Sequence, residues 1–323
     1  MKTIAIFTSG GDAPGMNACI RAVVRTCLHH NIAVYGILHG YQGMIEGQFK
    51  QLGTHDVGNI IQRGGTILKS SRSTDFRTEE GMQKAYKNLA KHNIDGVIAI
   101  GGDGTFAGAK EFSSKYAIPF IGLPGTIDND LLGTDYTIGY DTALNNVINA
   151  VDKIKDTAAS HDRLFFVEVM GKDAGFIALR SGIGVGALAI LIPEVHTDLD
   201  GLIAKLASAY ERKKSSSIII VAEGDDAGGA YKIAEKVKAK LPQYDTRVSV
   251  LGHLQRGGNP SALDRMLASR LGNEAVNALM AKKSSVMVGI VNGKVCYTPF
   301  ANAIKHHQKI KTEFLKLADI LAA

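Results

Sequence analysis

The sequence predicts an α/β fold with mostly parallel sheets, divided into two domains. Short β-branched and apolar runs alternate with helical patterns from one end of the chain to the other, which is typical of parallel strands joined by crossover helices. The chain has 323 residues, 45% of them hydrophobic, so it can bury a large core and is longer than one average domain. We expect interleaved domains with a soft boundary near Gly139: residues 1–138 with about 252–300, and residues 139–251 with about 301–323.

The first half of the chain sets each strand before a turn and a helix. TIAIFT precedes a glycine-rich turn and a helix predicted over 16–30, and AVYGIL follows as the next strand. IDGVIAI precedes GGDGT and a helix that ends at Tyr116, and IPFIGL precedes PGTIDND. A long helix is predicted over 142–160, because its apolar residues recur at helical spacing.

The second half offers four more strand candidates, LFFVEVM, ALAILIP, SIIIVAEG and RVSVLG. Near the end, VMVGIV and KVCYT are separated by Asn292 and Gly293. This dipeptide suits the tight turn of an antiparallel hairpin, so we expect one hairpin in an otherwise parallel arrangement.

Charge and cysteine content narrow the class of partner. Basic residues number 37 and acidic residues 31, and the scattered positive charge favours small phosphorylated ligands over nucleic acid, since no basic stripe is interleaved with aromatic residues. Cys19, Cys27 and Cys296 lack metal-ligand spacing and predict reduced thiols in the cytoplasm. No apolar run suits a signal peptide or a membrane span, so we expect a soluble cytoplasmic protein with neither a nucleic-acid nor a membrane partner.

Two loops, TSGGDAPGMN and GGDGTFAGA, set Gly-Gly-Asp directly after a predicted strand. Glycines let the backbone approach phosphate oxygens, and the start of the following helix favours an anion. Asp103 would then ligate a magnesium ion bound to those phosphates; the alternative is a tight turn with Asp103 as the helix cap. Because ligands bind at the carboxyl ends of parallel strands, the two loops predict one shared site.

Two further segments supply candidate catalytic groups. RGGTILKSSRS contains Arg72, which could neutralise charge on a transferring phosphoryl group or be an ordinary exposed arginine. PGTIDND contains the Thr126 hydroxyl and two carboxylates, Asp128 and Asp130, which would share one side of an extended backbone. A carboxylate within reach of a hydroxyl suits phosphoryl transfer, although the same residues suit an Asx-turn loop.

These motifs together resemble a known family. TSGGDAPGMN, RGGTIL, GGDGT, PGTIDND, DTAASHDR, EVMG, VAEG and LGHLQRGG occur in the order and spacing of the bacterial-type 6-phosphofructokinases, over nearly the whole chain. The resemblance implies two Rossmann-like α/β domains, the first binding ATP and the second fructose 6-phosphate, with the active site in the cleft between them. It also implies a glycolytic kinase that moves the γ-phosphoryl group of magnesium-bound ATP to the 1-hydroxyl of fructose 6-phosphate, in a homotetramer whose active site is shared between subunits.

The resemblance implies roles for the matching residues. Asp128 resembles the catalytic base, assisted by Arg72, Thr126 and Asp130, and Asp103 resembles the magnesium ligand. Arg163 and Arg247 would reach in from a neighbouring subunit. The implied ATP contacts are Gly11, Arg72, Ser73, Gly102, Asp103, Gly104 and Thr105. The implied sugar-phosphate contacts are Thr126, Ile127, Asp128, Arg163, Met170, Gly171, Lys172, Glu223, Arg247, His253, Leu254, Gln255 and Arg256.

Departures from the family pattern bear on the phosphoryl donor and on regulation. Pyrophosphate-dependent relatives carry an acid after GGD and a lysine before TIDND, whereas this chain has Gly104 and Gly125, so ATP is the predicted donor. A basic pocket for an ADP or phosphoenolpyruvate effector is implied at Arg21, Arg25, Lys155, Arg212, Lys213 and Lys214. Thr54 stands where an arginine is common and Leu188 where a glutamate would hold the effector's metal. Ser216 is near the position of a frequent histidine, and Lys172 replaces an arginine. We therefore expect a weak or altered effector response.

Three alternatives stay open at this point. The chain could be a pyrophosphate-dependent phosphofructokinase. It could be a kinase of the NAD-kinase or lipid-kinase type, since those also use GGDGT, or a catalytically silent nucleotide-binding subunit. The fold does not choose among them, because doubly wound sheets host many activities.

Overall fold

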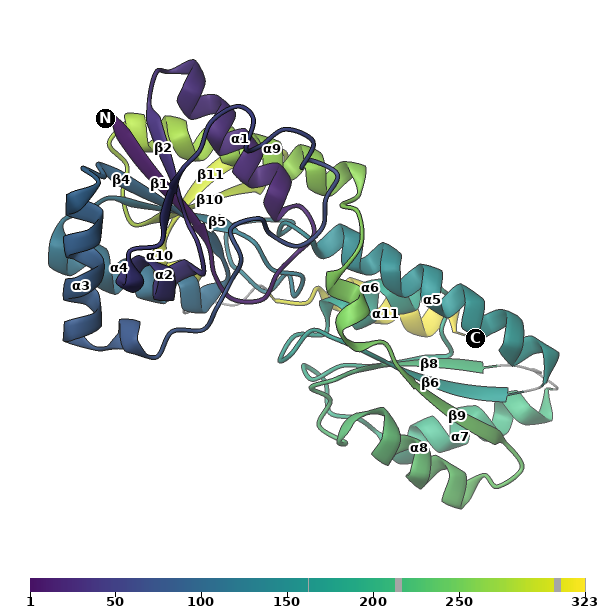
Figure 1. Ribbon diagram of the computed structural model, residues 1–323. Helices are drawn as coiled ribbons and strands as arrows, with labels where there is room; N and C mark the ends of the chain where they lie inside the picture. The colour runs from purple at the N-terminus through teal and green to yellow at the C-terminus, as the bar shows by residue number, and fades with distance from the viewer. Residues whose placement is uncertain (162, 213–216, 305–308, 323) are drawn as a thin grey trace. The chain divides into compact units, whose positions relative to one another are not determined.

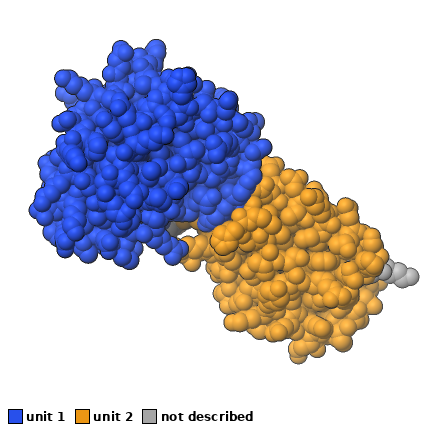
Figure 2. Space-filling view, viewed as in Figure 1, with its two compact units in different colours: residues 1–127, 131–142, 256–308 blue, residues 128–130, 143–255, 309–323 orange. Residues whose placement is uncertain are grey.

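The structure is a computed structural model that describes residues 1–161, 163–212, 217–304 and 309–322. The chain forms two compact units (Figure 2). Unit 1 comprises Met1–Ile127, Leu131–Thr142 and Arg256–Gln308, and unit 2 comprises Asp128–Asp130, Ala143–Gln255 and Lys309–Ala323. Each unit is therefore assembled from three separate stretches of sequence.

Unit 1 is built on a seven-stranded sheet with the order β11-β10-β5-β4-β1-β2-β3 (Figure 1). Its strands are β1 (Thr3–Thr8), β2 (Ala33–Ile37), β3 (Phe49–Gln51), β4 (Gly96–Gly101), β5 (Phe120–Pro124), β10 (Val286–Val291) and β11 (Lys294–Pro299). All neighbouring pairs are parallel except β2 with β3 and β10 with β11. Central strands β4 and β5 are buried along their whole length, as expected of strands covered on both faces.

Helices cover both faces of this sheet. On one face, α2 (Gly40–Glu46), α3 (Glu79–Lys91), α4 (Asp103–Tyr116) and α10 (Phe300–Ala303), with the short 3-10 helix η1 (Asp75–Arg77), supply an aromatic-rich core. On the other face, α1 (Met16–His29) packs against α9 (Ala262–Met280). Phe106, Phe112, Phe120 and Phe300 are fully buried or nearly so, and large apolar burial of this kind is the main stabilising contribution to such a unit.

Unit 2 has a smaller, wholly parallel sheet with the order β7-β8-β6-β9. Its strands are β6 (Arg163–Val169), β7 (Ala189–Leu191), β8 (Ser217–Ala222) and β9 (Asp245–Val250). Its helices are α5 (Tyr140–Ser160, which begins in unit 1), α6 (Phe176–Gly184), α7 (Leu199–Glu211), α8 (Gly229–Lys240) and α11 (Thr312–Leu321), with the 3-10 helix η2 (Gly252–Arg256) after β9. Helices α7 and α8 cover one face of this sheet, through a core that includes Leu206 and Ile233.

The predicted α/β class with mostly parallel sheets is confirmed. The hairpin is confirmed too: Val291 pairs with Lys294, and Asn292 and Gly293 have φ of 49° and 75°, as a two-residue turn with positive φ requires. The helix predicted over 142–160 begins earlier, at Tyr140, and the ALAILIP run forms a strand of only three residues. No helix in the described ranges is both long enough and apolar enough to cross a membrane.

Candidate active site

The loops that follow β1, β4 and β5 meet at one edge of the unit 1 sheet. These three parallel strands are neighbours, and β2 lies on the other side of β1, so the chain reverses its order across the sheet here. The Ser9 N–H donates to the Ile100 carbonyl at 2.9 Å, and the Gly125 N–H donates to the Gly101 carbonyl at 3.0 Å. The edge is therefore a topological switch point, where open α/β sheets bind their ligands.

The GGDGT loop ends β4 and starts α4. Gly102 is the N-cap and Asp103 the first helical residue, so the alternative in which Asp103 is the cap is wrong. The Asp103 side chain is exposed, and its carboxylate accepts a hydrogen bond from the Gly104 N–H at 2.7 Å. A Cβ added at Gly104 would have no atom within 4 Å. The first turn of α4 therefore presents a carboxylate beside open space, and the buried Tyr41 hydroxyl anchors it by donating to the Thr105 carbonyl at 2.6 Å.

Asn17, at the end of TSGGDAPGMN, organises the loop that carries Arg72. Its buried amide donates to the carbonyls of Arg63 at 3.1 Å and Gly64 at 3.0 Å, and accepts from the Ile67 N–H at 2.8 Å. The sequence interpretation assigned no role to Asn17. An amide within a glycine-rich loop is only a weak signal, because its partners lie about 50 residues further along the chain.

Within this loop, Arg72 and Ser73 differ in what they contact. Arg72 is exposed and forms no ion pair within the part of the chain that the structure describes. The Ser73 hydroxyl donates to the Gln42 side chain at 2.7 Å and accepts from the Phe76 N–H at 3.1 Å. Arg72 therefore has its charge available, whereas the Ser73 hydroxyl serves the fold.

Arg256 lies against the first glycine-rich loop. Its guanidinium donates to the Asp12 carbonyl at 3.1 Å, and a Cβ added at Gly11 would lie 2.5 Å from Nη1 of this arginine. The fold thus brings a predicted ATP contact and a predicted sugar-phosphate contact together within unit 1.

The PGTIDND segment follows β5, and its side chains alternate in burial. Thr126, Asp128 and Asp130 are half-buried, whereas Ile127 and Asn129 are buried. The prediction of extended backbone is wrong at Asn129, whose φ of 53° is left-handed. The alternation nevertheless leaves Thr126, Asp128 and Asp130 all half-buried.

Buried neighbours hold the start of this segment. The Thr137 hydroxyl donates to the Thr126 carbonyl at 2.6 Å, and the Ile138 N–H donates to the Pro124 carbonyl at 2.8 Å. A Cβ added at Gly102 would lie 4.0 Å from that of Thr126. Thr126 therefore abuts the GGDGT loop.

In unit 2, the loops after β6, β8 and β9 are joined by hydrogen bonds. The Lys172 N–H donates to the Glu223 carboxylate at 2.8 Å, and the Met170 N–H donates to the Gln255 side chain at 3.2 Å. Glu223, Lys172, His253 and Leu254 are exposed. Gln255 is fully buried, and its amide group also donates to the Gly252 carbonyl at 3.0 Å, so its side chain ties two loops together.

Arg163 and Arg247 lie toward the other end of this sheet. Arg163 opens β6 and pairs across the ladder with Asp245, the first residue of β9. The Asp245 carboxylate accepts from Arg163 at 2.8 Å and from Arg247 at 3.1 Å. Hydrogen bonding from Arg163 is the main effect that lowers the pKa of Asp245 below its usual value. The sequence interpretation missed Asp245, because nothing local marks it as a partner of an arginine 82 residues away.

The residues proposed for an effector pocket are only partly described. Arg21 is half-buried and Arg25 is exposed, one turn apart on α1, while Thr54 is exposed. In unit 2, Lys155 donates to the Val185 carbonyl, and Leu188 is buried among the apolar residues that α7 and α8 cover. Arg212 is exposed at the end of α7. Lys213, Lys214 and Ser216 lie outside the described residues.

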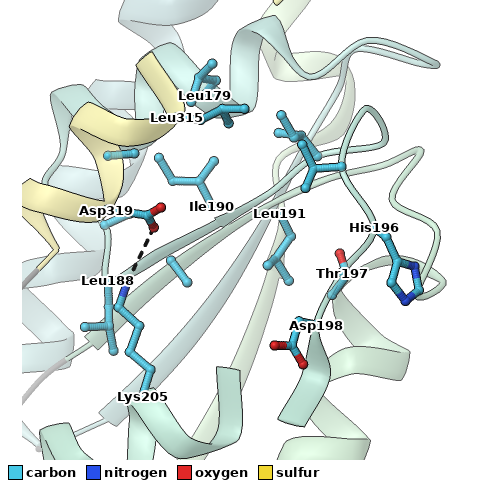
Figure 3. Close-up of a pocket in the computed structure, with 15 residues that line it drawn as sticks. Leu179, Leu188, Ile190, Leu191, His196, Thr197, Asp198, Lys205, Leu315 and Asp319 are labelled. Atoms are coloured by element: carbon cyan, nitrogen blue, oxygen red, sulfur yellow. Dashed lines mark ion pairs between the residues drawn. The ribbon is translucent and has the colours of Figure 1, made fainter. Parts of the chain in front are cut away.

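Unit 2 contains a cavity of about 190 Å³, and Leu188 is one of the residues that line it (Figure 3). Its walls include β7, Leu179 of α6 and Leu315 of α11. The polar side chains that line it are already engaged: Lys205 with Asp319, His196 with Asp226, Thr197 with Asp225, and Asp198 with the Gly201 N–H. Among the described residues that line the cavity, each basic side chain therefore already has an acidic partner.

Glycine-rich loops at a switch point, an exposed acid at a helix start and two acids after the next strand are the parts of an α/β phosphotransferase. A family profile described as Phosphofructokinase matches residues 3–279. The chain belongs to the phosphofructokinase family.

Similar proteins agree with this assignment. An ATP-dependent 6-phosphofructokinase of Cytophaga hutchinsonii is 55% identical over 99% of this chain and 98% of its own length. An ATP-dependent 6-phosphofructokinase 1 of Thermus thermophilus is 53% identical, with both chains fully covered. Among solved structures, the phosphofructokinase of Saccharomyces cerevisiae matches with a TM-score of 0.90 and 33% identity, over 94% of this chain and 45% of that one. This chain thus spans about half the length of the yeast chain.

Proposed function

We propose that this chain catalyses the ATP-dependent phosphorylation of fructose 6-phosphate at its 1-hydroxyl, the phosphofructokinase step of glycolysis. The observation that supports this most is that the chain resembles ATP-dependent enzymes over its whole length. The chain also carries Asp128 and Asp130 soon after β5, the strand next to the one that ends in the GGDGT loop. A NAD-kinase or lipid-kinase activity has no such support, and a silent subunit would not need an exposed Arg72.

In this proposal Asp128 is the base. It takes the proton of the 1-hydroxyl as the sugar oxygen bonds to the γ-phosphorus and the bond to the bridging oxygen of ADP breaks. Arg72, whose charge is available, stabilises negative charge on the moving phosphoryl group. The backbone at Thr126 and the Asp130 carboxylate help to place the reacting hydroxyl.

Magnesium suits the first turn of α4. No group of three or more metal-ligating side chains occurs among the described residues, but magnesium held by phosphates and water needs only one or two carboxylates. The exposed Asp103 fits that requirement. Bound there, the ion would supply charge neutralisation to the phosphate oxygens.

The donor is ATP, and Gly104 supports this more strongly than Gly125. A side chain at Gly104 would enter open space, so the glycine is not required by the fold. A Cβ at Gly125 would lie 2.7 Å from the Ile100 side chain and 3.0 Å from that of Met16. Packing against Ile100 and Met16 therefore explains why residue 125 is a glycine. The glycine at residue 104 has no such packing reason, and its effect is to leave room for ATP.

The sugar-phosphate site is shared between copies of the chain. Glu223 follows the carboxyl end of β8, next to β6, whereas Arg163 opens β6. Val169 lies six residue steps along the strand from Arg163, which is roughly 20 Å at about 3.3 Å per residue. One copy therefore cannot bring Arg163 and Glu223 to the same phosphate ester, and a second copy supplies the arginine pair, in keeping with a homotetramer.

Effector control by ADP or phosphoenolpyruvate is weak in this proposal. The buried Leu188 offers no carboxylate for an effector's metal, and the Lys155 ammonium is already bound to the Val185 carbonyl. A sigmoidal fructose 6-phosphate curve relieved by ADP would contradict this part of the proposal. A cytoplasmic location remains a prediction from the sequence.

Steady-state kinetics test the reaction and the donor together. Wild type and Asp128→Asn are assayed with fructose 6-phosphate and magnesium, with either ATP or pyrophosphate. We expect turnover with ATP and a kcat lower by a factor of about 100 or more in the variant, since a positioned base contributes about that much. Preference for pyrophosphate, or an active Asp128→Asn, would contradict the proposal.

A further inference from the structure

Asp264 is a buried acid on α9 that the proposed reaction does not use. Its side chain is fully buried. One carboxylate oxygen accepts a hydrogen bond from the Gly139 N–H at 2.8 Å, and the other accepts from the Thr142 N–H at 2.8 Å and from the Thr142 hydroxyl. These three donors compensate an acid that would otherwise be costly to bury.

The same hydrogen bonds join the first turns of two helices. The Thr142 hydroxyl, in the first turn of α5, accepts from the Ser261 N–H at 2.9 Å, and Ser261 in turn caps α9 by accepting from the Asp264 N–H at 3.2 Å. A carboxylate is favoured at such a position, because the N-termini of both helices carry positive partial charge. Thr142 is also the last residue of unit 1 before α5 continues into unit 2.

The turn that Asp264 holds is itself bonded to the start of the PGTIDND segment. Gly139 follows Ile138, which forms a β-bridge with Gly125, and Thr137 donates to the Thr126 carbonyl at 2.6 Å. Thr137, Ile138 and Gly139 are all buried. A short, buried path therefore runs from Asp264 to the backbone of Thr126.

We propose that Asp264 is a positioning residue for phosphoryl transfer. Its carboxylate ties Gly139 and Thr142 to helix α9, and these bonds hold the backbone that leads into Asp128. This inference rests on the proposed function. Phosphoryl transfer depends on reactants held in register, and a misplacement of about 1 Å can cost a factor of about 100 in rate. Asp264, Thr142 and Gly139 are not among the proposed substrate contacts, so the effect of changing them should fall on kcat and leave substrate binding nearly unchanged.

Three substitutions probe this path. Asp264→Asn puts an amide NH₂ where the carboxylate accepted hydrogen bonds, so it cannot accept from all three donors. Thr142→Val keeps the shape of the side chain and removes the hydroxyl, whereas Thr142→Ser keeps the hydroxyl. Asp152→Asn is the matched control, because Asp152 is an exposed acid on the same helix α5.

The variants are compared as full chains by kcat, by KM for ATP and fructose 6-phosphate, and by amide hydrogen exchange of the peptide spanning 137–145. We expect kcat of Asp264→Asn and Thr142→Val to fall by about tenfold or more, with each KM within about threefold of wild type. The peptide should exchange faster in both variants. Thr142→Ser and Asp152→Asn should behave as wild type.

The outcomes separate the two hypotheses. A wild-type protein without turnover rejects the proposed function. An active wild type, together with variants whose kcat is unchanged or falls only with the folded fraction, overturns the positioning role. If Asp264→Asn does not fold, Thr142→Val decides, because it leaves the carboxylate and two of its three donors in place.

Discussion

The guanidinium of Arg256 occupies the space that a side chain at residue 11 would need. A Cβ on Gly11 would lie 2.5 Å from Nη1 and 2.9 Å from the central carbon of that guanidinium. Gly11 is not one of the glycines whose backbone has a positive φ. The glycine is therefore required by the neighbouring arginine and not by its own conformation.

Gly11→Ala should fold but move Arg256. The clashing atoms are the end of a flexible side chain, which can swing away, so we expect a change in the free energy of unfolding below about 1 kcal/mol. The displaced guanidinium should raise KM for fructose 6-phosphate by about tenfold, because the loss of one charge-assisted hydrogen bond weakens binding by about that factor. Urea denaturation and steady-state kinetics measure the two effects.

The matched control is Gly53→Ala, where a Cβ would meet only the Asp56 carboxylate at 3.8 Å, an ordinary contact. Arg256→Ala combined with Gly11→Ala should raise KM no more than Arg256→Ala alone, because both changes remove the same contact. Additive effects would show that Gly11 acts independently of the arginine.

Asn17→Ala should destabilise unit 1 through the Arg72 loop. The substitution leaves the half-buried Ile67 N–H without its acceptor and two carbonyls without a donor, so we expect a loss of about 2–4 kcal/mol in the free energy of unfolding. Asn149→Ala, at an exposed position on α5, should change it by less than about 0.5 kcal/mol. Equal midpoints in urea for the two variants would contradict the scaffold role of Asn17.

Sequence patterns predicted the strands of this fold better than its short elements. β4 and β5 are continuous apolar runs, and the hairpin is marked by Asn292 and Gly293. Strand β3 and helix α2 were not predicted. Strand β3 has only three residues, two of them exposed, and α2 is a short helix flanked on both sides by residues with left-handed backbone. Local pattern carries little information about elements that tertiary contacts stabilise.

The same limit applies to the site. Motifs point to Asp103, Arg72 and Asp128 as candidates because these residues stand in loops whose composition is itself unusual. Asn17, Asp245 and Asp264 act through partners 46 to 125 residues away. Their roles depend on which loops the sheet brings together, and this is visible only once the strands are ordered.

Substitution of the two glycines proposed to govern the donor should give opposite results. Gly104→Asp enters open space, so the protein should fold normally while kcat/KM for ATP falls by about tenfold, because a carboxylate there repels the phosphates. Gly125→Lys meets Ile100 and Met16 at 2.7 Å and 3.0 Å, so overpacking should cost about 1–3 kcal/mol of stability. Thermal unfolding and ATP kinetics of both variants test this, and full ATP activity in Gly104→Asp would contradict the role of Gly104.

Co-expression of two inactive variants tests whether the sugar-phosphate site is shared. Arg163→Ala and Glu223→Ala should each have very low activity alone. Mixed oligomers should regain activity, because some sites combine the intact Glu223 of one copy with the intact Arg163 of another. The control is co-expression of the single variants Arg163→Ala and Arg247→Ala. One copy supplies both arginines to a site, where they bind the same Asp245, so every mixed site lacks one of the two arginines. Recovery in the control, or none in the test pair, would contradict sharing.

Asp264 should also make stability depend on pH with an unusual sign. Burial raises its pKa to about 6, with a smaller contribution from Asp141, against the hydrogen bonds from Thr142 and Gly139, which lower it. The folded state therefore binds this proton more tightly than the unfolded state, whose carboxyl has a pKa near 3.8. Between about pH 4 and pH 6 its contribution to the free energy of unfolding should decrease as pH rises, by about 3 kcal/mol in all, and stay constant above.

The paired carboxylates behave in the opposite way, because Asp245 and Asp56 have lowered pKa values and lose their contribution as pH falls. The measurement must therefore be a difference. Urea titrations at pH 4.5, 5.5, 6.5 and 7.5 give the free energy of unfolding of wild type and of Asp264→Asn. Subtracting the second value from the first cancels the effects that the two proteins share. We expect this difference to become more favourable to wild type as pH falls from about 6.5 to 4.5. A flat difference would show that the three hydrogen bonds balance burial at Asp264, and a difference that moves the other way would show that they outweigh it; either result contradicts the prediction.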